Sequence, residues 1–223
     1  MSTLTVGYIV DLVEKKAVDE NNDDFSQAEL IGLYNLALRF IVSLVPRAYT
    51  IKISQLLAAG SEQSIPSDGL QLVNVLRNMG TDGETPGASI LEASLAAMNR
   101  LVPNWSTETA AAVVDNFMRI PDMDASFYIS PPNDGTGYIQ MVHTATPPTS
   151  TYDEDGDWED DKIPLSDEFV PALPDAMLFI VYDDDSDYPG NTPRSQYYFQ
   201  RAMTILGLKD EHMERRKRPW QQL

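Results

Sequence analysis

The sequence predicts an α+β protein: a helical bundle built from the N- and C-terminal helices, with a β-rich central insertion. Three observations lead to this class. Apolar residues recur at helical spacing in the first 48 residues, and they do so again after residue 164. Between these segments the pattern changes to the alternation that is typical of strands. We therefore divide the 223 residues into a helical part, residues 1–48 and 164–223, and an insertion, residues 49–163.

Two helices are predicted in the first 48 residues. In the first, apolar side chains recur three or four positions apart, at Leu4, Tyr8, Ile9, Leu12 and Val13. After a polar break at residues 19–24, Ser26 is a suitable N-cap, and Glu29 stands three residues later as a capping box requires. An apolar face then continues until Pro46, which ends the second helix because proline cannot donate the next hydrogen bond.

The insertion begins with alternating residues 49–54, which predict a strand. Residues 70–76 fit a second strand, with a short helical turn as the alternative. Residues 88–102 predict a helix, because Ile90, Leu91, Leu95 and Met98 would share one side. Residues 127–130 and 138–143 are two further strands, and the Pro- and Gly-rich spacer between them predicts a hairpin with an extended tip. The acidic segment 153–161 is expected to be an exposed loop.

The last third returns to helical periodicity. Ser166 is a candidate cap for a segment in which Pro174 predicts a kink or a break into two pieces. The final helix is expected to begin near Thr192, with Pro193 at its first position. The chain then ends in a basic cluster at residues 215–218 that precedes Trp220.

Composition excludes several classes of protein. Sixteen Lys and Arg residues stand against 34 Asp and Glu, a formal charge of -18 that excludes a free-standing binder of nucleic-acid phosphates. The absence of cysteine excludes disulfides, thiol nucleophiles and Cys-based metal sites. No apolar stretch approaches the ~20 residues of a membrane span, and the N-terminus has no secretory pattern. These features predict a soluble acidic protein from a reducing compartment, with no membrane partner.

The sequence also argues against an enzyme. His143 and His212 are the only side chains that ordinarily titrate near neutral pH, and neither lies in a nucleophile, phosphate-loop or dinucleotide motif. A calcium loop beginning at Asp183 fails, because Tyr188 and Arg194 occupy the positions that need Gly and Glu. We therefore expect no catalytic residues, no metal and no cofactor.

Several short sequence features, in their order along the chain, resemble those of the head-to-tail adaptor (connector) proteins of tailed bacteriophages. The first is the acidic turn with Phe25-Ser26 and the helix carrying residues 29–30 and 34–37. The second is the middle segment with residues 103–105, 127–133 and 145–148. The third is the combination of residues 163–165, the acidic joint at 183–188 and a final helix with Tyr197 and Tyr198. The acidic segment around Asp153 and Pro174 within a helix depart from the family pattern.

The resemblance implies a structural virion protein that forms a ring, commonly of twelve copies, below the portal of a DNA-filled capsid. Its expected partners are further copies of itself, the portal protein, tail tube, nozzle or fibre proteins, and DNA that passes through without specific binding. It would be assembled in the host cytoplasm and reside in the neck of the virion. The alternative is an acidic DNA mimic that inhibits a host nucleic-acid-binding enzyme; the densest acidic runs, however, fall in expected loops rather than along helices.

Two sets of contact residues are predicted. Under the resemblance, the C-terminal tail would dock on the portal through Arg215, Arg216, Lys217, Arg218 and Trp220. The alternative for this tail is a solvated end. Contacts with a neighbouring subunit or with the tail are expected at the hairpin tip and at the last helix, where apolar residues occur on more than one side. These residues are Pro131, Pro132, Asn133, Asp134, Tyr197, Phe199 and Met203.

Overall fold

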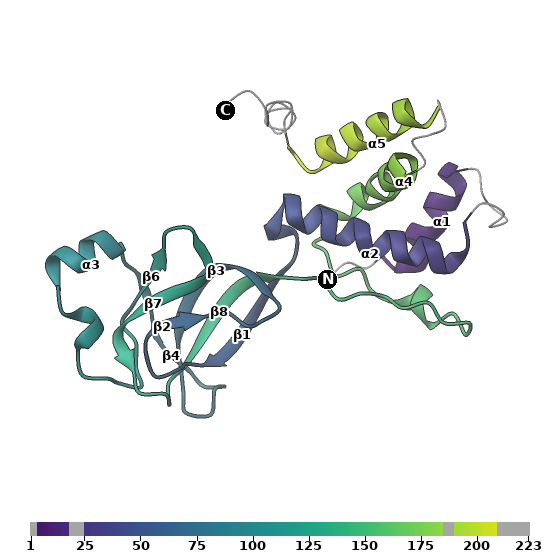
Figure 1. Cartoon of the computed structure of the whole chain (residues 1–223). Coiled ribbons are helices and arrows are strands. Elements are labelled where there is room, and N and C mark those ends of the chain that lie inside the picture. Colours follow the sequence, from purple (N-terminus) through teal and green to yellow (C-terminus); the bar gives the residue numbers. More distant parts are fainter. Residues whose placement is uncertain (1–3, 18–24, 185–189, 209–223) are drawn as a thin grey trace, which may run out of the picture. The chain divides into compact units, whose positions relative to one another are not determined.

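The computed structural model describes residues 4–17, 25–184 and 190–208 (Figure 1). The chain folds as two compact units. Unit 1 combines Met1–Tyr49 with Pro147–Leu223, and unit 2 is the segment Thr50–Thr146 between them. The chain is mixed α+β, as its sequence predicts. None of the helices in the described part of the chain combines the length and apolar character needed to cross a bilayer.

Unit 1 is helical. Its helices are α1 (Val6–Ala17), α2 (Gln27–Leu44), α4 (Leu173–Asp184) and α5 (Asn191–Ile205). Short 3-10 helices occur at Pro46–Ala48, Asp157–Asp160 and Val170–Ala172. The predicted capping box is present at α2: the Glu29 amide donates to the Ser26 hydroxyl oxygen, and the Glu29 carboxylate accepts from the Ser26 amide at 2.8 Å. These bonds satisfy two backbone donors that the helix itself leaves free.

Helix α4 is the centre of unit 1. Its first six residues, Leu173 to Leu178, are all buried, which is the pattern of a helix covered on more than one side. Both α2 and α5 pack on it, and Figure 1 shows α4 between these two helices. Helix α1 contacts α4 and α2 as well. Segments far apart in the sequence therefore contribute to one hydrophobic core.

Pro174 marks the break that the sequence predicts. A 3-10 helix at Val170–Ala172 leads into α4, and Pro174 stands in the first turn of that helix. In the first turn proline costs little, because the backbone donors there have no partner within the helix. The segment before α4 is thus a separate short piece, and α4 itself starts beside the proline.

The acidic segment belongs to unit 1, whereas the sequence analysis placed it in the insertion. The chain returns to unit 1 at Pro147 rather than at residue 164. The reason is Trp158, which is 3% exposed within the hydrophobic core of unit 1, together with Ile163 and Leu165, which are fully buried there. Because Trp158 stands among acidic residues, no apolar pattern in the sequence indicated that it is part of the core.

Unit 2 consists of two four-stranded sheets. The first has the order β1-β8-β3-β4 and the second the order β2-β7-β6-β5, with β5 and β6 the parallel pair among otherwise antiparallel neighbours. The bounds are β1 Thr50–Leu56, β2 Gly60–Ser64, β3 Gly69–Met79, β4 Pro86–Ser89, β5 Leu91–Glu92, β6 Asn116–Ile120, β7 Met123–Asn133 and β8 Tyr138–Ala145. The core lies between the sheets, because both contribute to one buried cluster that includes Val75, Met141, Phe117 and Ile129.

The predicted hairpin between residues 127–130 and 138–143 is wrong, although both strands exist. Strand β8 pairs with β1 and β3, while β7 pairs with β2 and β6 in the other sheet. The connection between them therefore crosses from one sheet to the other. Alternating residues show that a strand has one buried face, but they do not specify its partner, and a short Gly-rich spacer suits either arrangement.

The predicted helix at residues 88–102 is also wrong over its first half. Helix α3 spans only Leu95–Leu101, and the preceding residues form β4 and β5. Ile90 is 5% exposed and Leu91 is 65% exposed, so neighbouring residues face opposite ways, as in a strand. Pairing of β4 with β3 and of β5 with β6 outweighs the helical spacing of these apolar residues.

The connection between β7 and β8 is held by one side chain, that of Asn133. Its amide donates to the carbonyls of Ala111 and Ala112 at 3.0 and 3.2 Å, and its Oδ1 accepts from the backbone amides of Gly135 and Gly137 at 2.8 and 3.2 Å. Asn133 is 1% exposed. A Cβ at Gly137 would overlap the Ala112 carbonyl and the Asn133 amide, so this close approach requires glycine.

We predict that Asn133→Ala lowers the free energy of unfolding of unit 2 by about 3 kcal/mol, because it removes four hydrogen bonds and leaves buried backbone groups without partners. The matched control is Asp134→Asn, since Asp134 is exposed and its side chain contacts only Thr136 among the hydrogen bonds of the described residues. Hydrogen exchange of unit 2 peptides, followed by mass spectrometry, measures both effects. Equal protection in the two variants would contradict the role of Asn133.

Candidate interaction surface

The described residues contain no candidate metal centre. Within residues 4–17, 25–184 and 190–208, no group of three or more His, Asp or Glu side chains is arranged to hold a metal ion. His143 is 1% exposed and lies in β8 on the same side as buried Ile139 and Met141. Neither of its ring nitrogens has a hydrogen-bond partner within the described structure. His212 lies outside the described residues.

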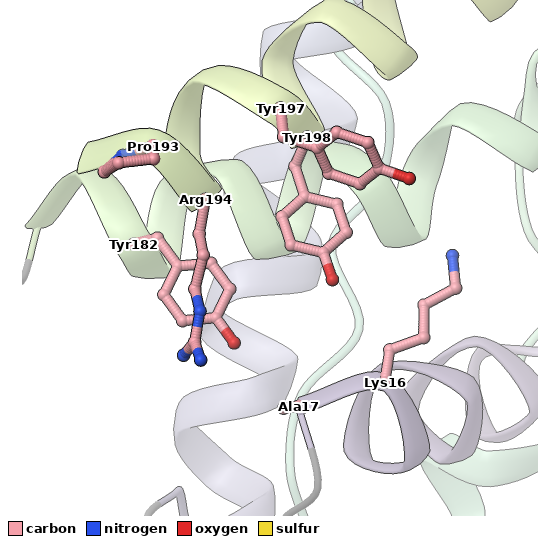
Figure 2. Close-up of a pocket in the computed structure, with 7 residues that line it drawn as sticks. All are labelled: Lys16, Ala17, Tyr182, Pro193, Arg194, Tyr197 and Tyr198. Atoms are coloured by element: carbon pink, nitrogen blue, oxygen red, sulfur yellow. The ribbon is translucent and has the colours of Figure 1, made fainter. Parts of the chain in front are cut away.

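Aromatic and cationic side chains gather where α5 meets α4. We call this cluster the tyrosine–arginine face; it consists of Tyr182, Arg194, Tyr197, Tyr198 and Arg201. The Tyr182 and Tyr198 rings stack at 5.8 Å, and Tyr197 meets Tyr198 edge-on at 5.2 Å. Arg194 lies over the Tyr182 ring at 5.5 Å, as Figure 2 shows, and Arg201 lies over the Tyr197 ring at the same distance. Positive charge over aromatic faces holds both guanidinium groups in place.

A buried carboxylate lies behind this face. Asp175, in the first turn of α4, is 1% exposed and forms ion pairs with cations from two other helices. Lys16 of α1 donates to Asp175 Oδ1 at 3.1 Å, and Arg201 Nε of α5 lies 3.3 Å from Oδ2. A buried carboxylate requires such partners, because leaving it unpaired is costly. These two ion pairs therefore link α1 and α5 to α4.

The environment of the face perturbs two ionisable groups. Partial burial raises the pKa of Tyr198, and the nearby Tyr182 and Asp175 add to the shift. The Tyr197 hydroxyl, which accepts a hydrogen bond from Arg201 at 3.1 Å, raises the pKa of Arg201, and the charge of Asp175 acts in the same direction. Tyr198 thus holds its proton, and Arg201 its charge, more strongly than an unperturbed tyrosine or arginine would.

An open pocket of about 340 Å³ lies within the face. Figure 2 shows its lining, which combines the aromatic rings and Arg194 with Lys16, Ala17 and Pro193. Tyr197 is 54% exposed, so its ring is available to another molecule. Asp184 and Arg194 also border a neighbouring hollow on α2, so the face is not uniformly positive. Tyr and Arg are the residue types most enriched at the energetic centres of protein–protein interfaces, and this face therefore fits binding of a protein segment better than catalysis.

The match to a known family decides between the remaining classes of function. A family model described as SU10 adaptor protein matches residues 5–222, and thus spans both units. The chain belongs to the SU10 adaptor family. This is a family of phage head-to-tail adaptors, so the resemblance seen in the sequence is confirmed. No curated protein matches the chain. Membership places this adaptor among the structural proteins of the virion neck.

The structure separates the contact residues that the sequence predicts on α5. Tyr197 is exposed and forms part of the tyrosine–arginine face. Phe199 is half-buried and packs against Phe40 and Phe179, with ring centroids 6.4 and 5.0 Å apart. Met203 is 7% exposed. The apolar residues on a second side of α5 therefore complete the core of unit 1 in this adaptor, and Tyr197 is the predicted contact residue that remains available.

The predicted contact residues at 131–134 are mostly internal as well. Pro132 and Asn133 are buried and Pro131 is half-buried, because this stretch ends β7 and lies against Ala111. Asp134 alone among the four is exposed. This stretch is therefore not an extended tip, and Asp134 is the most exposed of the four predicted contact residues.

The remaining predicted residues, Arg215, Arg216, Lys217, Arg218 and Trp220, lie outside the described residues. Sequence reasoning missed Lys16, Arg194 and Arg201 as a group, because α1 and α5 are separated by most of the chain. A partial signal was present: Arg194, Tyr197, Tyr198 and Arg201 recur at spacings of three and four, which places them on one side of a helix.

We predict that the double variant Lys16→Ala and Arg201→Ala destabilises unit 1 by about 3 kcal/mol, because it leaves the Asp175 carboxylate buried without a cation. This value is at the low end of the range for broken buried pairs, since both cations are partly exposed. Adding Asp175→Asn to the same background should restore most of the loss. Denaturant unfolding followed by far-UV circular dichroism measures the cycle, and additive effects would show that the three groups are not coupled.

Proposed function

We propose that this adaptor is a structural virion protein that forms a ring below the portal, provides the surface on which the tail is attached, and leaves a conduit for DNA. The observation that carries the proposal is the family match over residues 5–222, because it covers both units rather than a shared motif. The ring is made of copies of the chain itself, and the expected number is twelve. Portal and tail proteins, including tail tube, nozzle or fibre components, are the other partners.

The surface of unit 1 supports an assembling protein. An exposed cluster of tyrosine and arginine is unusual on a chain with a formal charge of -18, since most of its surface repels other copies. Such a cluster provides the aromatic and bidentate contacts that stabilise protein interfaces. The acidic remainder suits a conduit, because like charge keeps DNA from adsorbing as it passes.

The DNA-mimic alternative receives less support. A mimic would present carboxylates along a helix or groove at phosphate-like spacing, whereas residues 153–161 carry their acids on a turn anchored by Trp158. The family match also points to a virion component rather than to an inhibitor.

The decisive experiment is mass measurement of the purified protein alone and after mixing with the portal protein of the same phage. We expect the free chain to be monomeric at low salt, because -18 per copy repels neighbours, and the mixture to contain a closed ring of one defined copy number on the portal. A cryo-EM map of the particle gives the location directly. A particle in which the chain occupies a non-ring position would overturn the proposal.

We predict that the basic C-terminal tail strengthens portal binding. Deleting residues 215–223 should leave the fold intact but weaken binding to the portal sharply, because four cations and Trp220 are lost from each copy and modest contacts multiply around a ring. Deleting residues 221–223 alone is the matched control and should have little effect. Sedimentation with purified portals at increasing salt measures both, and equal binding by the two deletions would mean that the tail is a solvated end.

A further inference from the structure

Unit 1 carries a second charged surface, which we call the acidic turn, residues 153–161. Seven of its nine residues are Asp or Glu. Trp158 anchors it in the core, the Asp153 side chain accepts from the Asp157 amide at 3.0 Å, and Glu154 and Asp155 are exposed at its outer edge. The backbone is thus fixed while the carboxylates face solvent, so the turn presents a preformed acidic surface.

The acidic turn and the tyrosine–arginine face lie at opposite ends of α1. At the N-terminal end, the Val6 amide donates to the Asp161 carbonyl at 2.9 Å, and Gly7 packs closely against Glu159. At the C-terminal end, Lys16 and Ala17 line the pocket of the face. Lys16 lies ten positions after Val6 in the helix, which is ~15 Å along the axis. A turn anchored at one end of α1 therefore cannot enter the pocket at the other end of the same molecule.

We propose that the acidic turn of one copy docks into the tyrosine–arginine face of the next copy. This rests on the proposed ring and names the contact that closes it. The fit is one of charge and chemistry: Arg194 attracts carboxylates, and the exposed Tyr197 contributes an aromatic surface together with a hydroxyl that can hydrogen-bond. Lys16 and Arg201 are already engaged by Asp175, so they hold the face in shape rather than binding the incoming turn.

The arrangement has the geometry that a ring requires. Two different complementary surfaces on one subunit make a head-to-tail contact, and repetition of that contact closes into a ring when the rotation per subunit is suitable. A contact between two identical faces would instead stop at a dimer. A second copy is favoured over another acidic partner, because every copy brings the complementary surface at a fixed position and at equal concentration.

Cross-linking tests the contact directly, because the chain has no cysteine of its own. Asp155→Cys places a thiol on the acidic turn, and Thr204→Cys places one on an exposed position one turn beyond Arg201 on α5. The full chain carrying both, mixed with portal protein and a short bis-maleimide, should give a ladder of dimers, trimers and higher species. Each single-cysteine variant should stay monomeric.

Dimers from Thr204→Cys alone would show a face-to-face contact, and the absence of a ladder would show a different occupant; either overturns the proposal.

Charge reversal in the double-cysteine chain provides the specificity control. Arg194→Glu should reduce the ladder at least about tenfold, because a like charge then meets the acidic turn. The matched reversal Arg39→Glu, on an exposed part of α2, should leave the ladder unchanged. A chain carrying Arg194→Glu and Thr204→Cys, mixed with one carrying Glu154→Lys and Asp155→Cys, should recover the cross-linked dimer. Equal loss in Arg194→Glu and Arg39→Glu would overturn the proposal.

Portal binding distinguishes failure of this contact from failure of the adaptor function. Co-sedimentation of the double-cysteine chain with portals is measured in the same mixtures before the cross-linker is added. Portal binding without a ladder retains the adaptor function and rejects the docking of the acidic turn on this face. A ladder without portal binding retains the contact and rejects the proposed place below the portal.

Discussion

Burial of one carboxylate organises unit 1. Asp175 lies in the first turn of the central helix, where its neighbours are apolar, and a charge there is tolerated only with cations brought to it. Lys16 comes from the first described helix and Arg201 from the last, so the ion pairs fix α1 and α5 around α4. Apolar packing alone would tolerate small rotations of α5. The position of Arg201 removes that freedom, and Tyr197 is oriented with it because the two side chains are hydrogen-bonded.

Unit 2 depends on a different constraint, which is the crossing from β7 to β8. The two strands belong to different sheets, so the backbone between them must turn without forming ladder bonds. Asn133 supplies the missing partners from its side chain, using both its donors and its acceptor. The Pro- and Gly-rich stretch is therefore not an exposed tip but a packed crossing, in which glycine is needed for close approach.

Local signals in the sequence predicted local structure well. The capping box at Ser26, the break near Pro174 and the strands around residues 49–54 and 138–143 depend on neighbours in the chain, and the structure confirms them. Features that depend on distant partners were not predictable in the same way. The spacing of Ile90 and Leu91 is compatible with a helix. Their segment is extended because β4 pairs with β3 and β5 pairs with β6, and these partners lie outside the segment. Likewise, the pocket beside Tyr197 needs Lys16 from the other end of the chain, which no spacing rule connects to it.

The charge of the chain constrains how copies can meet. At -18 per copy, most orientations of two molecules are repulsive, and the repulsion extends over about 8 to 10 Å at physiological salt. A cationic and aromatic cluster on such a surface influences the relative orientation of two copies more than it would on a neutral protein. The reason is that an acidic neighbour can approach favourably at this cluster. Acidity thus contributes specificity as well as solubility. Repulsion disfavours unspecific association, and under the proposed docking the small face rich in tyrosine and arginine selects the orientation in which copies meet.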